Sequence, residues 1–332
     1  MTTLVTGATG FAGINIVRAL AESGTRVVAL DTVGANDECI RYIHDLADKI
    51  QFVIGDVLDT QSTMKLAEET GIRRIVHAAA ITPSGSVESL VPTRVINVNL
   101  MGTLNMLEIA RKISAERFVF VSSSGVYGAP KNNKKLVTEA SQTQPGNLYS
   151  ICKLTCELLM KRYKHLYDLS AVVGRMSAIY GPMERVTTSR GNPSMIYKLI
   201  KAHLEGRAVK ARGRDFVSDY THVHDASYMW RNLTLVDELT HDVYNISAGV
   251  AYLLSDVLKT LQQIDPNFIF SYGDADQEVD VEVSPESERG ALDLTRSINE
   301  FGFSPRYDLR EGLEDYLQWA REYPTLFTPM MV

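Results

Sequence analysis

Cysteine is scarce in this chain, and its scarcity limits the folds that the chain can adopt. Only three of the 332 residues are cysteine, namely Cys39, Cys152 and Cys156. Their positions form no CxxC pair and no Cys/His spacing, so neither a disulfide framework nor a zinc site built on cysteine is indicated. We therefore expect reduced thiols in a cytoplasmic protein that holds no metal.

Long hydrophobic runs and blocks of basic residues are also missing. No apolar run approaches the roughly 20 residues that cross a bilayer, and Thr3–Thr6 resembles a strand rather than the start of a signal peptide. A formal charge of −6 without a lysine or arginine block argues against a protein that follows nucleic-acid phosphates. We expect no membrane and no nucleic-acid partner, which leaves small molecules as ligands.

The first half of the chain alternates short apolar segments with longer helix-period segments. This alternation is typical of a parallel sheet whose strands are joined by helices. Strands are predicted at 3–6, 26–30, 51–54, 74–77, 118–122 and 170–174, and helices at 13–23, 60–70, 99–113 and 148–167. Beyond Arg175 the alternation loosens, and Gly, Pro and charged residues gather at 181–193 and 273–290.

A glycine-rich turn follows the first predicted strand. Missing side chains let a backbone turn tightly, approach a pyrophosphate and direct the amides of a helix N-terminus at it. The second predicted strand ends at Asp31, where a carboxylate binds the adenosine ribose and repels the 2′-phosphate of NADP. These features favour NAD as cofactor, held by Gly7, Thr9, Gly10, Phe11, Ala12, Gly13 and Asp31.

Two later strand ends extend the predicted cofactor pocket. Asp56 and Val57 follow the third strand, and Ala78, Ala79 and Ala80 follow the fourth. Because small residues at the carboxyl ends of parallel strands leave room for a ligand, we expect the alanines beside the pyrophosphate and ribose, and Asp56 near the adenine.

Tyr149 and Lys153 lie four residues apart at the start of a predicted helix and therefore share one face. A phenol that acts as a base near neutral pH needs its pKa lowered by about three units, or about 4 kcal/mol. A lysine ammonium and a positively charged nicotinamide have the right sign. Upstream, the fifth strand ends in Ser122, Ser123 and Ser124, whose hydroxyls suit a substrate oxygen.

The order of these motifs resembles the extended short-chain dehydrogenase/reductase family, which includes NAD-dependent sugar epimerases and dehydratases. Further matching segments are 175–182, 219–225, 289–294 and 301–305. The resemblance implies that Tyr149 takes a proton, Lys153 holds the nicotinamide ribose and lowers the tyrosine pKa, and Ser123 binds the reacting oxygen. It also places Asn99, Ser122, Tyr149 and Lys153 among the cofactor-binding residues.

The implied fold is a Rossmann-type doubly wound α/β sheet with a smaller C-terminal substrate-binding lobe. We expect residues 1–174 to form the NAD-binding domain, with 215–248 packing back onto it. Residues 175–214 and 249–332 would form the lobe, built from loops and helices. Family members pair across the helices at 99–113 and 148–167, so a homodimer is also implied.

Three functions remain open from the sequence. Dehydration is disfavoured, because family dehydratases carry Asp-Glu where this chain has Ser124-Gly125. The first hypothesis is a nucleotide-sugar epimerase of the UDP-hexose type, the second an NAD-dependent dehydrogenase of a free sugar, sugar acid or polyol, and the third a non-catalytic NAD-binding regulatory protein. The intact tyrosine, lysine and serine disfavour the third.

The substrate-binding positions separate the first two hypotheses only partly. Ala178 and Ser218 stand where relatives carry an asparagine and an arginine that contact the substrate diphosphate. Arg289 remains to bind a diphosphate, while Arg185 and Arg190 suit a carboxylate or polyol as well as a phosphate. We therefore predict Ser123, Ser124, Arg185, Arg190 and Arg289 as substrate-binding residues.

Overall fold

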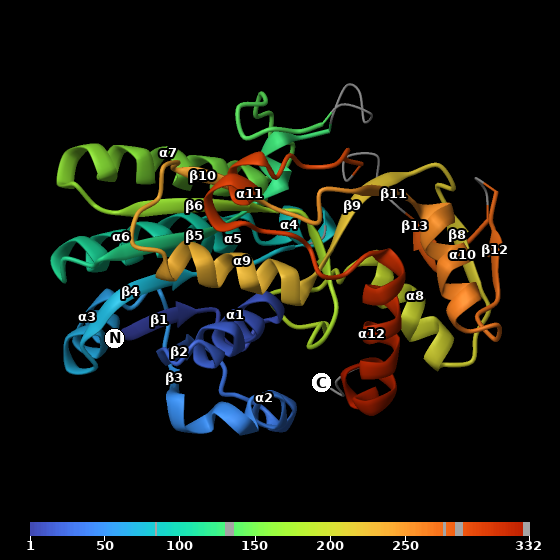
Figure 1. The fold of residues 1–332 in the computed structure, drawn as a ribbon, viewed down its shortest axis with the longest axis horizontal. Helices are drawn as coiled ribbons and strands as arrows, with labels where there is room; N and C mark the ends of the chain where they lie inside the picture. Colours follow the sequence, from blue (N-terminus) through green and yellow to red (C-terminus); the bar gives the residue numbers. More distant parts are fainter. Residues whose placement is uncertain (84, 130–135, 275–276, 283–287, 328–332) are drawn as a thin grey trace.

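The computed structural model describes residues 1–83, 85–129, 136–274, 277–282 and 288–327, and a seven-stranded sheet forms its centre (Figure 1). All neighbouring strands of this sheet are parallel. Their order is β10-β6-β5-β4-β1-β2-β3. The strands are β1 (Thr2–Thr6), β2 (Arg26–Asp31), β3 (Ile50–Ile54), β4 (Ile72–His77), β5 (Arg117–Ser123), β6 (Ala171–Met176) and β10 (Val243–Ile246).

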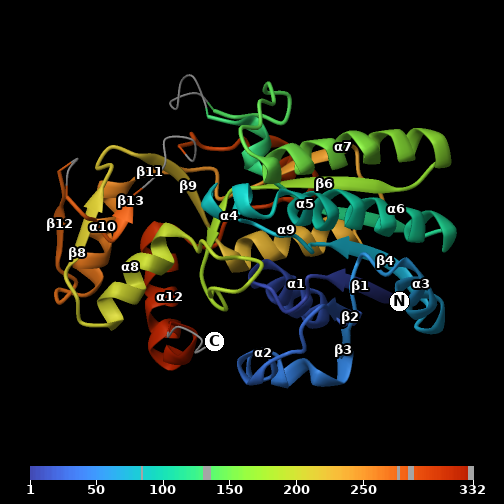
Figure 2. The same ribbon diagram turned by 180° about the vertical axis from the view of Figure 1, so that it is seen from behind.

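Helices cover both faces of this sheet, as the two opposite views show (Figures 1 and 2). On one face α1 (Phe11–Glu22) packs against α9 (Val223–Leu235), and on the other α6 (Gly102–Lys112) contacts α3 (Thr60–Glu69) and α7 (Leu148–Tyr167). Shorter helical segments are α2 (Asp37–Tyr42), α4 (Gly85–Leu90), α5 (Pro92–Ile96), α11 (Thr295–Phe301), η1 (His44–Lys49), η2 (Asn97–Met101), η3 (Ser124–Tyr127) and η5 (Pro324–Phe327).

The side chains of β5 explain why two helical layers are needed. Phe118 and Phe120 pack into the core beneath α6 and α7, whereas Val119 and Val121 pack into the core beneath α1 and α9. Because successive strand residues point to opposite faces, a strand with large apolar residues at every position is stable only when both faces are covered. The described part of the chain therefore forms the expected doubly wound sheet.

The C-terminal part contains two small sheets and a separate core (Figure 1). One sheet consists of β7 (Ala178–Tyr180), β9 (Val217–His222) and β11 (Ala251–Leu253), and the other of β8 (Val209–Arg212), β12 (Phe270–Tyr272) and β13 (Val281–Glu282). Helices α8 (Met195–Leu204), α10 (Leu254–Ile264) and α12 (Leu309–Glu322) bury residues of this core, including Leu199, Leu258 and Tyr316.

Three expectations from the sequence need correction. The lobe is not built from loops and helices alone, because it contains short strands whose two to four residues show too little alternation to be detected. The seventh strand, β10, was not predicted, although it lies within the segment expected to pack back onto the sheet. Parts of the 273–290 segment lie outside the described residues.

The third correction concerns the helix expected over 99–113. Helical structure begins at Pro92, a residue whose fixed φ suits a first helical position, and runs through a π-turn at 97–101 into α6. In the π-turn Asn99 accepts a hydrogen bond from the Ile81 N–H at 2.8 Å and donates one to the Ile81 carbonyl at 2.9 Å. The helix therefore fixes the loop that follows β4.

The strand order reverses between β1 and β4, and ligands of doubly wound sheets bind where such a reversal opens a crevice at the carboxyl ends of the strands. The glycine-rich turn follows β1 at this point, and the alanine loop follows β4. None of the helices in the described ranges is long and apolar enough to cross a membrane.

Candidate active site

The glycine-rich turn forms a close-fitting cradle at the crevice. Gly7 has a φ of +67°, and a Cβ there would lie 2.7 Å from the Cα of Ala79. A Cβ on Gly13 would lie 1.9 Å from the Gly7 carbonyl oxygen. Only glycine fits these two positions, and the amides of the first turn of α1 point out of the helix at this end. The cradle therefore suits a pyrophosphate.

Asp31 lies beside this cradle at the end of β2. One carboxylate oxygen accepts hydrogen bonds from the backbone N–H of Thr9 at 3.0 Å and from the Thr9 hydroxyl at 2.9 Å. The other oxygen accepts from the Thr32 N–H at 2.7 Å. These bonds hold the carboxylate where the sequence predicts a ribose, and its negative charge disfavours a 2′-phosphate.

The other predicted cofactor residues surround the same crevice. The Ala79 N–H donates to the Thr6 hydroxyl at 3.2 Å, which ties the alanine loop to β1. Val57 is buried and its carbonyl accepts from Asn105 at 3.0 Å, whereas Asp56 is exposed.

Ser122 is arranged differently from Ser123. Its hydroxyl is fully buried and donates to the carboxylate of Glu157 at 2.5 Å. Glu157 also pairs with Arg175 at 2.7 Å, and both side chains are almost fully buried. The Ser122 side chain therefore belongs to a charged network beneath the site, and the sequence motifs gave no signal for this ion pair.

Tyr149 and Ser123 meet at the end of β5. Asn147 caps α7 by accepting a hydrogen bond from the Ser150 N–H at 2.9 Å, so Tyr149 lies in the first turn of this helix. Tyr149 and Ser123 line one cavity, and Ser123 lies close enough to the phenol to act on its pKa. Burial raises the pKa of Tyr149, while the charge of Arg190 and the side chain of Ser123 lower it.

This pKa direction differs from the sequence-based expectation of a lowered tyrosine pKa. Lys153 lies one turn after Tyr149, with its ammonium 5.6 Å from the centre of the Tyr149 ring, but it donates its hydrogen bond to the carbonyl of Val121 at 2.7 Å. Burial lowers the pKa of Lys153 to about 8. The lysine ammonium is therefore bound to the backbone of β5, and burial of the phenol determines the direction of its pKa.

A cavity of about 660 Å³ opens next to this pair. Its lining includes the predicted residues Ser123, Ser124, Tyr149 and Arg289. Arg289 donates to the Ser124 carbonyl at 2.6 Å, and burial lowers its pKa to about 10. Since it remains charged at neutral pH, this wall of the cavity can attract an anionic group.

The same cavity contains the two positions at which the chain departs from its relatives. Ala178 and Ser218 both line it, so an asparagine and an arginine at these positions would stand at the wall of this cavity. Asp219 also lines the cavity; burial raises its pKa to about 6, although it accepts hydrogen bonds from Ser247 and from the Leu292 N–H. The sequence located the 219–225 segment but assigned no role to this carboxylate.

Arg185 and Arg190 are not among the described residues that line the cavity. Arg185 donates to the Thr9 carbonyl at 2.6 Å, on the cofactor side. Arg190 pairs with Glu184 at 2.8 Å and lies over the Phe11 ring at 5.3 Å. The two arginines therefore lie beside the glycine-rich turn, and their substrate contacts stay a prediction.

The fold and the glycine cradle define this protein as a dinucleotide-binding α/β protein. A family model described as the NAD-dependent epimerase/dehydratase family matches residues 3–247. The chain belongs to this family of enzymes, and NAD is its cofactor.

Individual relatives are similar over nearly the whole chain. A dTDP-glucose 4,6-dehydratase of Mycolicibacterium smegmatis is 29% identical, covering 99% of this chain and 96% of its own. A UDP-glucose 4-epimerase of the same organism is 28% identical, covering 97% and 99%. The solved structure of MoeE5 in complex with UDP-glucuronic acid and NAD is 27% identical, covers 97% of this chain and 99% of its own, and superposes with a TM-score of 0.79.

Proposed function

We propose that this enzyme is a nucleotide-sugar epimerase of the UDP-hexose type, with Tyr149 as its proton acceptor. The observation that carries the proposal is that Tyr149 and Ser123 lie together on the wall of the 660 Å³ cavity. Relatives that are named for UDP-glucose or bound to UDP-glucuronic acid support the substrate class.

The proposed chemistry assigns each side chain one task. NAD, when bound, supplies an acceptor for the hydride of the substrate carbon. The Ser123 hydroxyl binds the reacting oxygen of the substrate and orients it, and Tyr149 accepts the proton of that hydroxyl group. Lys153 is charged below its pKa of about 8. Its ammonium, with the positive charge of NAD when bound, would offset the burial that raises the pKa of Tyr149 and would favour the phenolate that accepts the proton.

The remaining predicted residues would hold the cofactor. Gly7, Thr9, Gly10, Phe11, Ala12 and Gly13 form the cradle, Asp31 binds the ribose, and Asp56, Val57, Ala78, Ala79, Ala80, Asn99 and Ser122 surround them. We further propose that residues 1–174 with 215–248 form the cofactor-binding unit, and that 175–214 with 249–332 form the substrate lobe.

Epimerisation is favoured over dehydration because of Gly125. A Cβ at this position would lie 2.4 Å from the hydroxyl of Ser150. Replacing Gly125 by the glutamate of the dehydratases would therefore require Ser150 to move. Neither Ser124 nor Gly125 supplies the carboxyl group that elimination of water needs for acid or base catalysis.

A second function is supported by the cavity lining. Among the described residues that line it, Arg289 alone carries a positive charge, whereas a diphosphate is held better by several cations. This lining also suits an NAD-dependent dehydrogenase of a free sugar, sugar acid or polyol.

One assay separates the two functions. The protein is incubated with NAD and either UDP-glucose or a panel of sugar acids, and the absorbance at 340 nm (the NADH band) is followed together with product stereochemistry by NMR. An epimerase produces the 4-epimer without accumulating NADH. Stoichiometric NADH with a sugar acid, and no epimer from any UDP-sugar, would replace the epimerase proposal by the dehydrogenase.

We also propose that the protein is a homodimer. Helix α7 exposes apolar side chains, with Leu158 at 62% and Leu166 at 49% of their surface, and such surfaces mark interfaces. Sedimentation that finds only monomer at micromolar concentration would exclude this.

The cysteines in the described ranges, all free and buried, support the proposed cytoplasmic location.

A further inference from the structure

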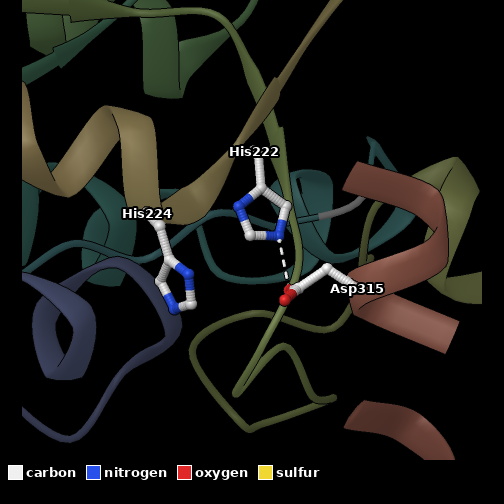
Figure 3. A group of neighbouring side chains, drawn as sticks. All are labelled: His222, His224 and Asp315. Carbon is white, nitrogen blue, oxygen red and sulfur yellow. Dashed lines mark ion pairs between the residues drawn. The ribbon is translucent and has the colours of Figure 1, made fainter. Parts of the chain in front are cut away.

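A cluster of two histidines and one aspartate lies outside the cavity that holds Tyr149. His222 ends β9, His224 stands in the first turn of α9, and Asp315 comes from α12 (Figure 3). One ligand atom from each residue lies within 4.8 Å of the other two. The shortest separation, 3.1 Å, joins Nε2 of His222 to Oδ2 of Asp315, which is about the spacing of neighbouring ligands around a zinc ion bound at roughly 2 Å.

The polar atoms of this cluster are poorly satisfied by the protein. The His222 side chain is completely buried, and neither of its ring nitrogens makes a hydrogen bond. Nε2 of His222 and the facing Oδ2 of Asp315 form an ion pair at 3.1 Å, but neither atom makes a hydrogen bond, and Nδ1 of His222 has neither kind of partner among the described residues. Buried polar atoms are nearly always hydrogen-bonded, and exceptions call for an explanation such as an ion.

His224 is held in the tautomer with its proton on Nε2, which leaves Nδ1 able to bind a cation. The Tyr42 hydroxyl donates its single proton to the Asn15 side-chain oxygen at 2.6 Å, and Nε2 of His224 lies 3.0 Å from the same hydroxyl. Nε2 must therefore carry the ring proton and donate it. Nδ1 therefore carries a lone pair on the side that faces His222 and Asp315 (Figure 3). It accepts a long hydrogen bond of 3.5 Å from the Tyr307 hydroxyl, which a bound cation would displace.

The hydrogen bond from His224 to Tyr42 has the form of the outer contacts that orient metal-binding histidines. Two cations, Arg18 and Arg306, lie near enough to lower the pKa of His224, although burial is the larger cause. Arg18 is paired with Glu22 and Asp45, and Arg306 with Asp225. Their charges are therefore partly neutralised.

We propose that His222, His224 and Asp315 bind a divalent transition-metal ion of the zinc class. Two imidazole nitrogens and one carboxylate oxygen leave a fourth position for water, and the 37% exposure of the Asp315 side chain gives the ion access. None of the three residues lines the Tyr149 cavity. The ion therefore has a structural role, joining α12 of the C-terminal part to the junction of β9 and α9.

The sequence-based expectation of no metal rested on the cysteine spacings. It missed this cluster because Asp315 is distant from the two histidines in the sequence, so no short spacing between ligand residues indicates the site. The inference does not depend on the proposed epimerase activity.

The test uses the full chain, from which a chelator first removes any metal. The chelator itself is then removed. Titration with Zn²⁺ by calorimetry and with Co²⁺ by visible absorption is expected to give one site per chain with tetrahedral cobalt bands. Zn²⁺ is also expected to raise the melting temperature by about 2–5 °C. H224A and D315N are each expected to weaken Zn²⁺ binding at least about tenfold, since each removes one of three ligands.

Matched controls keep the result interpretable. H165A removes an exposed histidine of α7, and E314Q neutralises the exposed neighbour of Asp315 on α12; both are expected to bind Zn²⁺ like the unmodified chain. The proposal is overturned if the chain binds no Zn²⁺ at about 100 µM, a concentration that would nearly saturate a micromolar site, or if H224A and D315N bind it unchanged. If one variant fails to fold without metal, as judged by circular dichroism, the other decides.

Discussion

The cofactor side and the substrate side of Tyr149 differ in how strongly the sequence determines them. On the cofactor side, backbone geometry is decisive, because Gly7 and Gly13 stand where any Cβ meets backbone atoms within 3 Å. On the substrate side, the cavity is lined by interchangeable side chains, and two of them, Ala178 and Ser218, lack the polar groups of relatives. The position of the cofactor is therefore set by backbone shape and its choice by the charge of Asp31, while the proposed substrate site offers few features that narrow the choice of ligand.

The largest effect is expected on the cofactor side, from Gly13→Ala. The new methyl group would lie 1.9 Å from the Gly7 carbonyl, and this rigid backbone atom must move. Because displacements of about 1 Å can reduce function about 100-fold, NAD affinity measured by calorimetry is expected to fall at least that much. Gly191→Ala is the matched control, since its Cβ meets nothing within 4 Å. Equal affinity in both variants would show that the cradle is not the cofactor site.

Lys153→Met is expected to reduce kcat about 100-fold, within the usual range for the loss of one acid–base element. The variant also isolates a stability effect. The pKa of Lys153 is lowered by burial from 10.5 to about 8, so the penalty of burying the charge is fully present below pH 8. Between pH 8 and 10.5 the folded chain loses this proton while the unfolded chain keeps it, and the free energy of unfolding rises.

The measurement is the difference in unfolding free energy between the unmodified chain and Lys153→Met, without NAD, as a function of pH. This difference is expected to increase by about 3 kcal/mol from pH 7 to 10.5, because each pKa unit corresponds to about 1.36 kcal/mol. A flat difference would mean that Lys153 is not a buried cation.

A smaller effect is expected on the substrate side, from Arg289→Gln. A hydrogen bond to a charged group is worth about 1.5–3 kcal/mol, so the KM for a UDP-sugar is expected to rise about tenfold or more while kcat changes little. Arg310→Gln, which removes an exposed arginine paired with Glu314, is the control. If the KM rises only for sugar acids, the result favours the dehydrogenase over the epimerase.

The smallest effect is expected from Asp31→Ala. Removing the carboxylate that would repel a 2′-phosphate is expected to narrow the preference for NAD over NADP about tenfold, or about 1.4 kcal/mol. The ratio of kcat/KM for the two cofactors measures it. No change in this ratio would remove Asp31 from the ribose site.

The same contrast explains what the sequence could predict. The strand alternation and the glycine spacing are local patterns, so six of the seven central strands and the cradle followed from them, while the pairing of Tyr149 with Ser123 came from the family resemblance. The Glu157–Arg175 pair, the buried Asp219 and the cluster of His222, His224 and Asp315 join distant segments. The directions of Arg185 and Arg190 also depend on how a loop folds across Thr9 and Phe11.

The pKa of Tyr149 shows this limit within the catalytic group itself. Helical spacing correctly places Lys153 on the same face, but burial of the phenol and the bond of the lysine to Val121 depend on the surrounding fold. The sequence therefore predicts which residues meet, whereas the balance of burial and charge requires the structure.

The proton-acceptor role of Tyr149 is tested most directly by comparing Tyr149→Phe with Tyr163→Phe. Tyr163 lies on the same helix, and its hydroxyl donates to Glu108 at 2.7 Å. With NAD and the substrate identified by the stereochemical assay, kcat of Tyr149→Phe is expected to fall about 1,000-fold, with NAD affinity unchanged and Tyr163→Phe near normal. If Tyr149→Phe keeps its kcat within a few fold of the unmodified enzyme, Tyr149 is not the proton acceptor.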